Sequence, residues 1–142
     1  MIELKPALQT LAVAFTFCAV SPVLSKDIAP VLFQCDMDQH PVICGALMTA
    51  LQSKALERAV ELSNEPANSD ALQTDQNAVL TIRYQEESRT EDRLSGRLVW
   101  LDQEGRRVDG PVLELTIMDS NLSALDLSPY ARTLVDVSDL PL

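Results

Sequence analysis

Residues 78–101, which read AVLTIRYQEESRTEDRLSGRLVWL, decide the fold. Apolar and polar residues alternate in both halves of this stretch, and a period of two is typical of strands that bury one face. The intervening residues 86–92 are all charged or polar, which is the composition of a turn. The stretch therefore predicts two antiparallel strands, 78–85 and 93–101, joined as a hairpin.

A third alternating segment, 112–119, follows a second charged turn at 102–110 and completes an antiparallel meander. One face of the meander is apolar and is formed by Leu80, Ile82, Tyr84, Leu94, Leu98, Trp100, Leu113, Leu115 and Ile117. Such a face must be covered, and helices are the available cover. Gly96 falls on the same face of the middle strand, where it would admit a closely packed helix or a β-bulge.

The segment 43–58 precedes the meander and has the periodicity of an amphipathic helix. Its apolar residues recur three and four positions apart, among them Leu47, Met48 and Leu51. The pattern can be continued to 63 as one long helix, but 59–63 also alternates as a short strand would. We favour the strand, because a meander of three strands alone covers a long helix poorly.

A second, shorter helix is expected over 129–137. Ser128 suits the N-cap, because its side chain can accept a hydrogen bond from the first turn, and Pro129 suits the first helical position. Tyr130 and Leu134 then recur on one face and would pack against the sheet. The sequence thus predicts an α+β domain, in which an antiparallel meander of three or four strands carries an N-terminal helix and a short C-terminal helix on one face.

Residues 1–25 have the layout of a cleaved secretory signal. Lys5 provides a weak positive start, an apolar run spans 7–20, and small or β-branched residues precede a cut before Lys26. The run is shorter than the ~20 residues of a membrane-spanning helix, so cleavage is favoured over an uncleaved anchor. We therefore expect a periplasmic or secreted protein whose mature form, 26–142, is a single domain.

The chain is acidic, with 21 Asp and Glu against 11 Lys and Arg and a net charge of −10. The signal contains one acidic residue, Glu3, and one basic residue, Lys5, so 20 acidic minus 10 basic residues leave the mature domain at −10. This charge argues against nucleic acid and anionic membranes as partners, because both would repel it. The acidic residues are dispersed, as expected for a solvated surface.

The mature domain keeps two cysteines, Cys35 and Cys44. An even pair in an exported domain favours a disulfide over two free thiols. The alternative is a redox-active pair, which prefers a Cys-x-x-Cys spacing, whereas eight residues intervene here. We expect a structural bridge that pins the N-terminal arm, 28–33, to the start of the first helix.

Asp36, Asp38 and His40 lie inside the loop that this bridge would close, and they are the candidate metal ligands. Three ligands within five residues and without a fourth partner form a weak pattern, and the loop lacks the glycine and distal glutamate of a calcium site. We expect a solvated loop, and neither a metal nor another cofactor.

Catalytic motifs are scarce in the sequence. A Ser–His–acid site would require His40, the single histidine, and no Gly-x-Ser-x-Gly motif accompanies it. The chain has no Walker-type loop and no dinucleotide fingerprint, and it contains only four glycines. We therefore expect no catalytic residues and a non-enzymatic domain.

The second face of the meander carries a candidate contact surface for a partner, formed by Arg97, Val99, Leu101, Val112 and Met118. Apolar side chains beside charged ones on a small exported domain are typical of such surfaces. The alternative is that the arm 28–33 covers this face. If the second turn centres on 105–106, Arg97 lies opposite Glu114.

Three hypotheses for function follow. The first is an accessory domain that binds another protein of the bacterial envelope. The second is a secreted inhibitor or immunity-type protein, whose acidity would speed its encounter with a basic enzyme or toxin. The third is a domain that binds a small ligand in a pocket between the 43–58 helix and the sheet.

The signal and the bridge predict the mass of the exported protein. We expect a chain that begins at Lys26 and is lighter than its fully reduced form by the hydrogen atoms that a disulfide loses. Intact-mass spectrometry of an exported sample, before and after reduction, measures both properties. A chain that retains 1–25 would indicate an uncleaved anchor instead.

Overall fold

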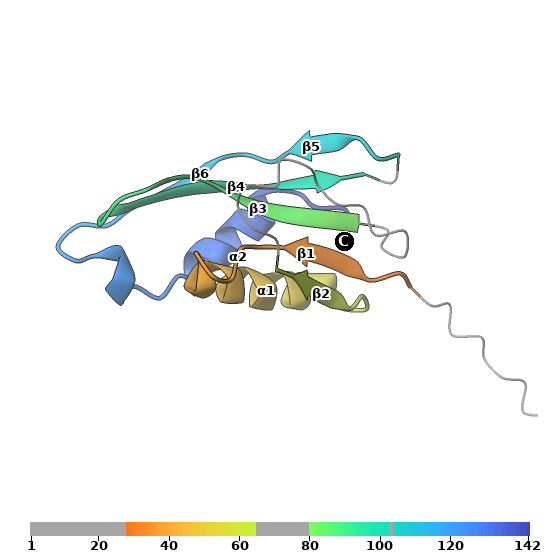
Figure 1. The fold of residues 1–142 in the computed structure, drawn as a ribbon, viewed down its shortest axis with the longest axis horizontal. Helices are drawn as coiled ribbons and strands as arrows, with labels where there is room; N and C mark the ends of the chain where they lie inside the picture. The colour runs from red at the N-terminus through yellow and green to blue at the C-terminus, as the bar shows by residue number, and fades with distance from the viewer. Residues whose placement is uncertain (1–27, 65–79, 103) are drawn as a thin grey trace, which may run out of the picture.

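The computed structural model describes residues 28–64, 80–102 and 104–142, and the expected signal lies outside these ranges. Within them, one sheet is covered on one face by two helices (Figure 1). The strands are β1 (Val31–Gln34), β2 (Val60–Ser63), β3 (Leu80–Arg89), β4 (Arg93–Leu101), β5 (Arg107–Asp109) and β6 (Leu113–Thr116). The helices are α1 (Pro41–Ala55) and α2 (Ser128–Val137), with a short 3-10 helix, η1 (Leu122–Ala124), before α2. The expected α+β class is confirmed.

The sheet is mixed and has six strands, which corrects the prediction of a purely antiparallel meander of three or four strands. Its strand order is β2-β1-β3-β4-β5, and β6 pairs with β4 as well. The β3–β4 hairpin is antiparallel as expected, but β1 runs parallel to both of its neighbours. The alternation of apolar and polar residues indicates which side chains share a face, but it does not indicate whether neighbouring strands run parallel or antiparallel. Of the two alternatives for 59–63, the strand is correct.

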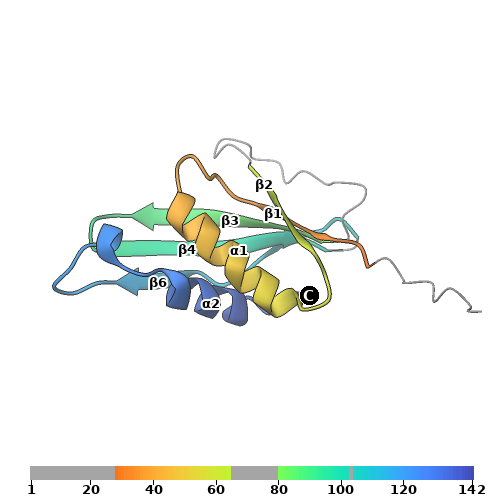
Figure 2. The same cartoon turned by 90° about the horizontal axis from the view of Figure 1, so that it is seen from below.

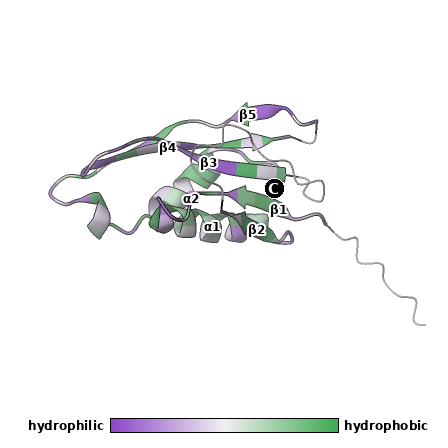
Figure 3. Ribbon diagram, viewed as in Figure 1, coloured by the Kyte–Doolittle hydropathy of each residue, from purple (hydrophilic) through white to green (hydrophobic). Residues whose placement is uncertain are grey.

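The N-terminal arm is an inner strand of the sheet and does not lie over the second face of the meander. β1 lies between β2 and β3, and Val31 and Phe33 are fully buried. The strand is hydrophobic along most of its length (Figure 3). A parallel strand that is buried on both faces forms a continuous apolar run, so its sequence shows no alternation.

One edge of β4 pairs with two short strands where a single long one was expected. Val99 lies opposite Asp109 of β5. Gly96 lies opposite Leu113 of β6, so the register shifts by one residue between the two pairings. Pro111 occupies the break, and a proline has no N–H to donate to a continuous ladder.

The expected pairing of Arg97 with Glu114 is wrong. The prediction placed Gly105 at the centre of the second turn, but Gly105 closes this turn by donating its N–H to the Asp102 carbonyl at 3.0 Å. Its φ of +75° is a conformation that glycine adopts without strain. Glu114 of β6 therefore lies opposite Ser95 of β4, and Arg97 Nε donates to Glu87 Oε1 at 2.7 Å.

The two helices lie side by side on one face of the sheet (Figure 2). α1 lies within two or three residues of the expected 43–58, and it ends at Leu56, whose φ of 41° cannot continue a right-handed helix. Every residue that the sequence assigned to the core is buried there or, for Met48, Leu113, Leu115 and Ile117, partly buried against it. No helix in the described ranges is long and apolar enough to cross a membrane.

The start of α2 differs from the expectation that Ser128 is its N-cap. The capping position is Leu127, and Ser128 is the first helical residue. Asp126 supplies the acceptor, because its Oδ1 accepts the Ser128 N–H at 2.9 Å. A charged carboxylate is a stronger acceptor than a hydroxyl, so the aspartate takes this role. Pro129 occupies the first turn as expected.

The expected disulfide between Cys35 and Cys44 is present, with a Cα–Cα distance of 5.8 Å. It joins the end of β1 to the first turn of α1, and both residues are buried. A bridge that closes so short a loop stabilises the fold by roughly 2–3 kcal/mol in the chain-entropy view. It therefore fixes the inner strand relative to the helix above it.

Gly96 accommodates an aromatic ring and not a helix. A Cβ built on Gly96 would lie 2.6 Å from the Tyr84 ring, which crosses from β3 over this position. The bulge expected near the glycine lies in the neighbouring strand, where β3 has Glu87 as an extra residue. The close approach of the ring to the backbone thus requires a glycine here.

Replacing this glycine tests the packing. We expect Gly96→Ala to lower the free energy of unfolding by about 1–3 kcal/mol, because the new methyl group overlaps the Tyr84 ring. The control is Gly45→Ala on α1, where a Cβ meets nothing within 4 Å. The control should gain up to about 1 kcal/mol, because alanine favours helix. Urea unfolding measures both changes, and an unaltered midpoint for Gly96→Ala would contradict the packing.

Candidate functional site

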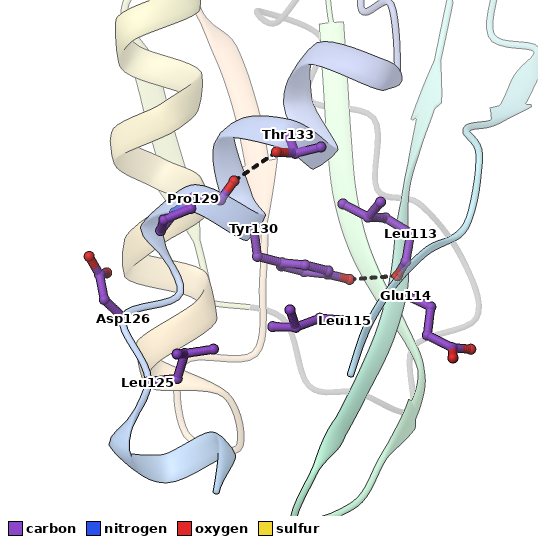
Figure 4. Close-up of a pocket in the computed structure, with 8 residues that line it drawn as sticks. All are labelled: Leu113, Glu114, Leu115, Leu125, Asp126, Pro129, Tyr130 and Thr133. Carbon is purple, nitrogen blue, oxygen red and sulfur yellow. Dashed lines mark hydrogen bonds between the residues drawn. The ribbon is translucent and has the colours of Figure 1, made fainter. Parts of the chain in front are cut away.

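A groove of about 400 Å³ lies between β6 and the start of α2 (Figure 4). Leu113 and Leu115 form one wall, and Leu125 and Pro129 form the other. Tyr130 extends across the groove from α2 towards β6 (Figure 4). The surface between the two elements is consequently mostly apolar.

The two hydroxyl groups of the groove are engaged by main-chain carbonyls. The Tyr130 hydroxyl donates to the Leu113 carbonyl at 2.9 Å and so ties α2 to β6. The Thr133 hydroxyl donates to the Pro129 carbonyl at 2.9 Å, within α2. Because these groups already serve the fold, the groove offers a ligand chiefly apolar contact.

The outer edge of β6 is unpaired in the described part of the chain, because β6 pairs there with β4 alone. In an antiparallel ladder, successive residues direct their N–H and C=O groups alternately to the partner strand and away from it. The Ile117 N–H donates to the Asp92 carbonyl at 2.8 Å, which sets the phase of the alternation. Glu114 and Thr116 therefore direct their main-chain groups away from β4, along the open edge.

Two exposed carboxylates flank the groove on opposite sides, Glu114 and Asp126 (Figure 4). Hydrogen bonds from the Ser128 side chain and N–H lower the pKa of Asp126, so it is charged at neutral pH. Glu114 lies 3.6 Å from Arg93 Nε in an exposed pair, which stabilises the fold by at most about 1 kcal/mol. The groove is thus apolar inside and negative at its sides.

A second polar cluster lies at the bulged end of β3, and its groups bind one another. Glu86 accepts two hydrogen bonds of 2.9 Å from Arg89 and one of 3.4 Å from Tyr84. The hydrogen bonds with Glu86 raise the pKa of Arg89. His40 Nδ1 lies 3.6 Å from Glu86 Oε2, which is too long for a hydrogen bond. This arrangement neutralises a partly buried carboxylate and explains its presence structurally.

The three candidate metal ligands do not converge. Asp36 Oδ1 accepts the N–H groups of Asp38 and Gln39, so this carboxylate shapes its own loop. His40 is directed towards β3, beside Glu86. In the residues that the structure describes, no group of three His, Cys, Asp or Glu side chains is arranged to hold a metal ion.

The candidate contact surface on the second face is not one surface. Val99 is 1% exposed and Met118 is 84% exposed. Met118 follows β6, beyond the end that pairs with Arg93, whereas Val99 is six residues further along β4. Of the others, Val112 is exposed and Leu101 is partly buried. The alternation of the sequence assigned these residues to one face of the sheet. The break at Pro111, before β6, separates them along that face.

The groove was missed because its apolar residues were assigned to the core. Leu113 and Leu115 do pack against the core, but each is only partly buried. Two sequence features bear on the groove. Pro111 shortens the strand that follows, and the loop from 117 brings Leu125 beside that strand. Neither feature shows from the sequence alone that two elements leave a space between them.

Comparison with known proteins identifies no family. No model of a protein family matches the chain, and no curated protein matches it. Among solved structures, the chain is similar to the crystal structure of protein VC0702 from Vibrio cholerae, with a TM-score of 0.39 and 11% sequence identity. The similarity covers 78% of this chain and 71% of that chain.

Tyrosine ionisation tests the burial of Tyr130, which lines the groove, and of Tyr84, whose ring lies against Gly96. The chain has two tyrosines, and desolvation raises the pKa of Tyr130 to about 12 and that of Tyr84 as well. We therefore expect less than half of the tyrosine absorbance change at 295 nm by about pH 11 in the folded protein, whereas the urea-unfolded chain titrates near pH 10.

The same shift predicts alkaline destabilisation. A pKa that is raised on folding adds stability that is complete below pH 10 and is lost as the pH rises towards about 12. Tyr130→Phe should reduce this loss, although it costs about 1 kcal/mol at neutral pH through the missing hydrogen bond. Two tyrosines that ionise near pH 10 in the folded chain would contradict the burial.

Proposed function

We propose that the chain is an exported, non-enzymatic domain that binds another protein through the groove between β6 and α2. The observation that carries the proposal is the combination of an apolar groove with a strand edge beside it that is unpaired in the described residues. Exposed apolar concavities on small domains are typical of sites for protein partners. Export is supported by the signal-like N-terminal sequence and by the disulfide, a bond that persists in oxidising compartments.

A binding role is also supported by the state of the groove's polar groups. The hydroxyl groups of Tyr130 and Thr133 donate hydrogen bonds to main-chain carbonyls, so neither is placed as an activated nucleophile or acid. The flanking carboxylates are exposed, and the pKa of Asp126 is lowered, which suits a charged surface group. These features favour recognition over catalysis.

A small apolar ligand is the second candidate occupant. The volume of about 400 Å³ falls within the range of about 300–1,000 Å³ that small-molecule sites have. Such a ligand would fill the groove but would leave the main-chain groups of Glu114 and Thr116 without a role. The strand edge therefore favours a polypeptide as the occupant.

An inhibitor or immunity-type protein could use the same groove, but its affinity would come mainly from electrostatic attraction to a basic partner. This alternative predicts a complex with a basic enzyme or toxin that weakens strongly between low and high salt, because long-range attraction to a chain of charge −10 is screened. A complex carried by the groove also depends on apolar burial and strand pairing, which salt does not screen, so it should persist at high salt.

Blocking the groove tests the proposal. Thr133→Arg places a bulky side chain at the groove from an exposed position of α2. The matched control is Thr49→Arg, at an exposed position of α1 where the threonine makes the same hydroxyl bond to the carbonyl four residues earlier. We expect Thr133→Arg to reduce crosslinking to the native envelope partner at least tenfold, and Thr49→Arg to leave it unchanged.

The measurement is quantitative mass spectrometry of crosslinked complexes from the native envelope fraction, with the folded state of each variant checked by circular dichroism. Equal recovery of the partner by wild type and by Thr133→Arg would contradict a site in the groove. Recovery of a bound apolar small molecule in place of a protein would favour the second candidate.

A further inference from the structure

We propose that the partner binds as an extended segment, which adds a strand to β6, inserts apolar side chains into the groove and places basic side chains beside Glu114. This inference rests on the proposed function and specifies the chemistry of the partner. It concerns the open edge of β6 and the groove beneath this edge.

The unpaired main chain selects an extended partner. Glu114 and Thr116 direct their N–H and C=O groups along the open edge, so a strand there can form the hydrogen bonds that β6 does not make on this side with any described residue. A helix or a folded surface would leave these groups to water. Strand addition is the binding mode that uses the edge and the groove together.

The apolar walls select alternate side chains of that segment. Leu113 and Leu115 face the helices, so the residues of an added strand that share their face lie over the groove. There they meet Leu125 and Pro129 on the opposite wall. Aliphatic side chains suit this position, because the hydroxyl groups of the groove already have acceptors.

The charges select the remaining side chains. Glu114 lies on the opposite face of β6 from Leu115, where the other alternate residues of an added strand would be. Glu114 already lies 3.6 Å from Arg93 Nε, but its side chain is 56% exposed, so its carboxylate can also attract a cation on an added strand. Asp126 adds negative potential on the groove side. A second copy of the chain is a poor occupant, because each copy carries a charge of −10 and would bring its own Glu114 to the shared edge.

Synthetic peptides test the inference directly. The probe is a fluorescein-labelled heptapeptide of alternating valine and lysine, acetylated and amidated at its ends. Two counterparts keep its length: one has glutamate for lysine, and one has N-methyl groups on alternate residues, which removes the donors for strand pairing. We expect the lysine peptide to bind the mature protein at least tenfold more tightly than either counterpart, as measured by fluorescence anisotropy.

Hydrogen exchange locates the bound peptide. Saturation with the lysine peptide should slow amide exchange at Glu114 and Thr116 at least tenfold, because both N–H groups acquire acceptors. Glu114→Gln should weaken the lysine peptide about threefold or more. The matched control is Glu104→Gln, since Glu104 also forms an exposed ion pair with an arginine but lies in the β4–β5 turn.

Several outcomes would overturn strand addition. These are equal binding of the lysine and N-methylated peptides, unchanged exchange at Glu114 and Thr116, or no binding of the lysine peptide at about 1 mM. A dimer of the free protein that Thr133→Arg dissociates in sedimentation would also overturn it, in favour of a second copy. If any of these is observed while Thr133→Arg still loses the native partner, strand addition fails and the proposed function stands.

Discussion

The pairing of β4 on both edges, under a face that the helices must cover, is the constraint on which the rest of the structure depends. β3 pairs with β4 along most of its length, and β5 and β6 share its other edge. Leu94 and Leu98 are fully buried in the core, so the strand cannot shift by one residue without exposing them. Every other element is placed against this hairpin, directly or through β1.

The groove follows from how the second edge of β4 is divided. Gly110 donates its N–H to the Leu98 carbonyl at 2.8 Å, and Pro111 then interrupts the ladder before β6 resumes it out of register. β6 is left short, and Tyr130 ties its first residue, Leu113, to α2. A single bridging hydroxyl at one end leaves the rest of β6 separated from the helix, and this separation is the groove.

The sequence predicted what depends on local periodicity and failed where distant segments meet. The hairpin, both helices and the disulfide are all signalled by residues a few positions apart, and the structure has each of them. β1 was missed because it is buried on both faces and so shows no alternation, and because its parallel partners β2 and β3 are distant from it in the sequence. The groove was missed for a related reason: Leu115 and Leu125 have an ordinary apolar pattern, and only the fold shows that they face each other across a space.

Protein interfaces are usually anchored by aromatic side chains, and this domain has few of them. Recognition through main-chain groups does not require such anchors. The arginines of the second sheet face are paired with neighbouring acids, as Arg97 is with Glu87 and Arg107 with Asp109, so this face has little net charge to offer. The open edge of β6 provides hydrogen bonds to any extended chain, whatever its sequence. Selectivity must then come from the side chains that flank the edge, and these are apolar towards α2 and acidic at Glu114. In the proposed mode of binding, the arrangement that lets the domain bind a strand also limits which strands it accepts.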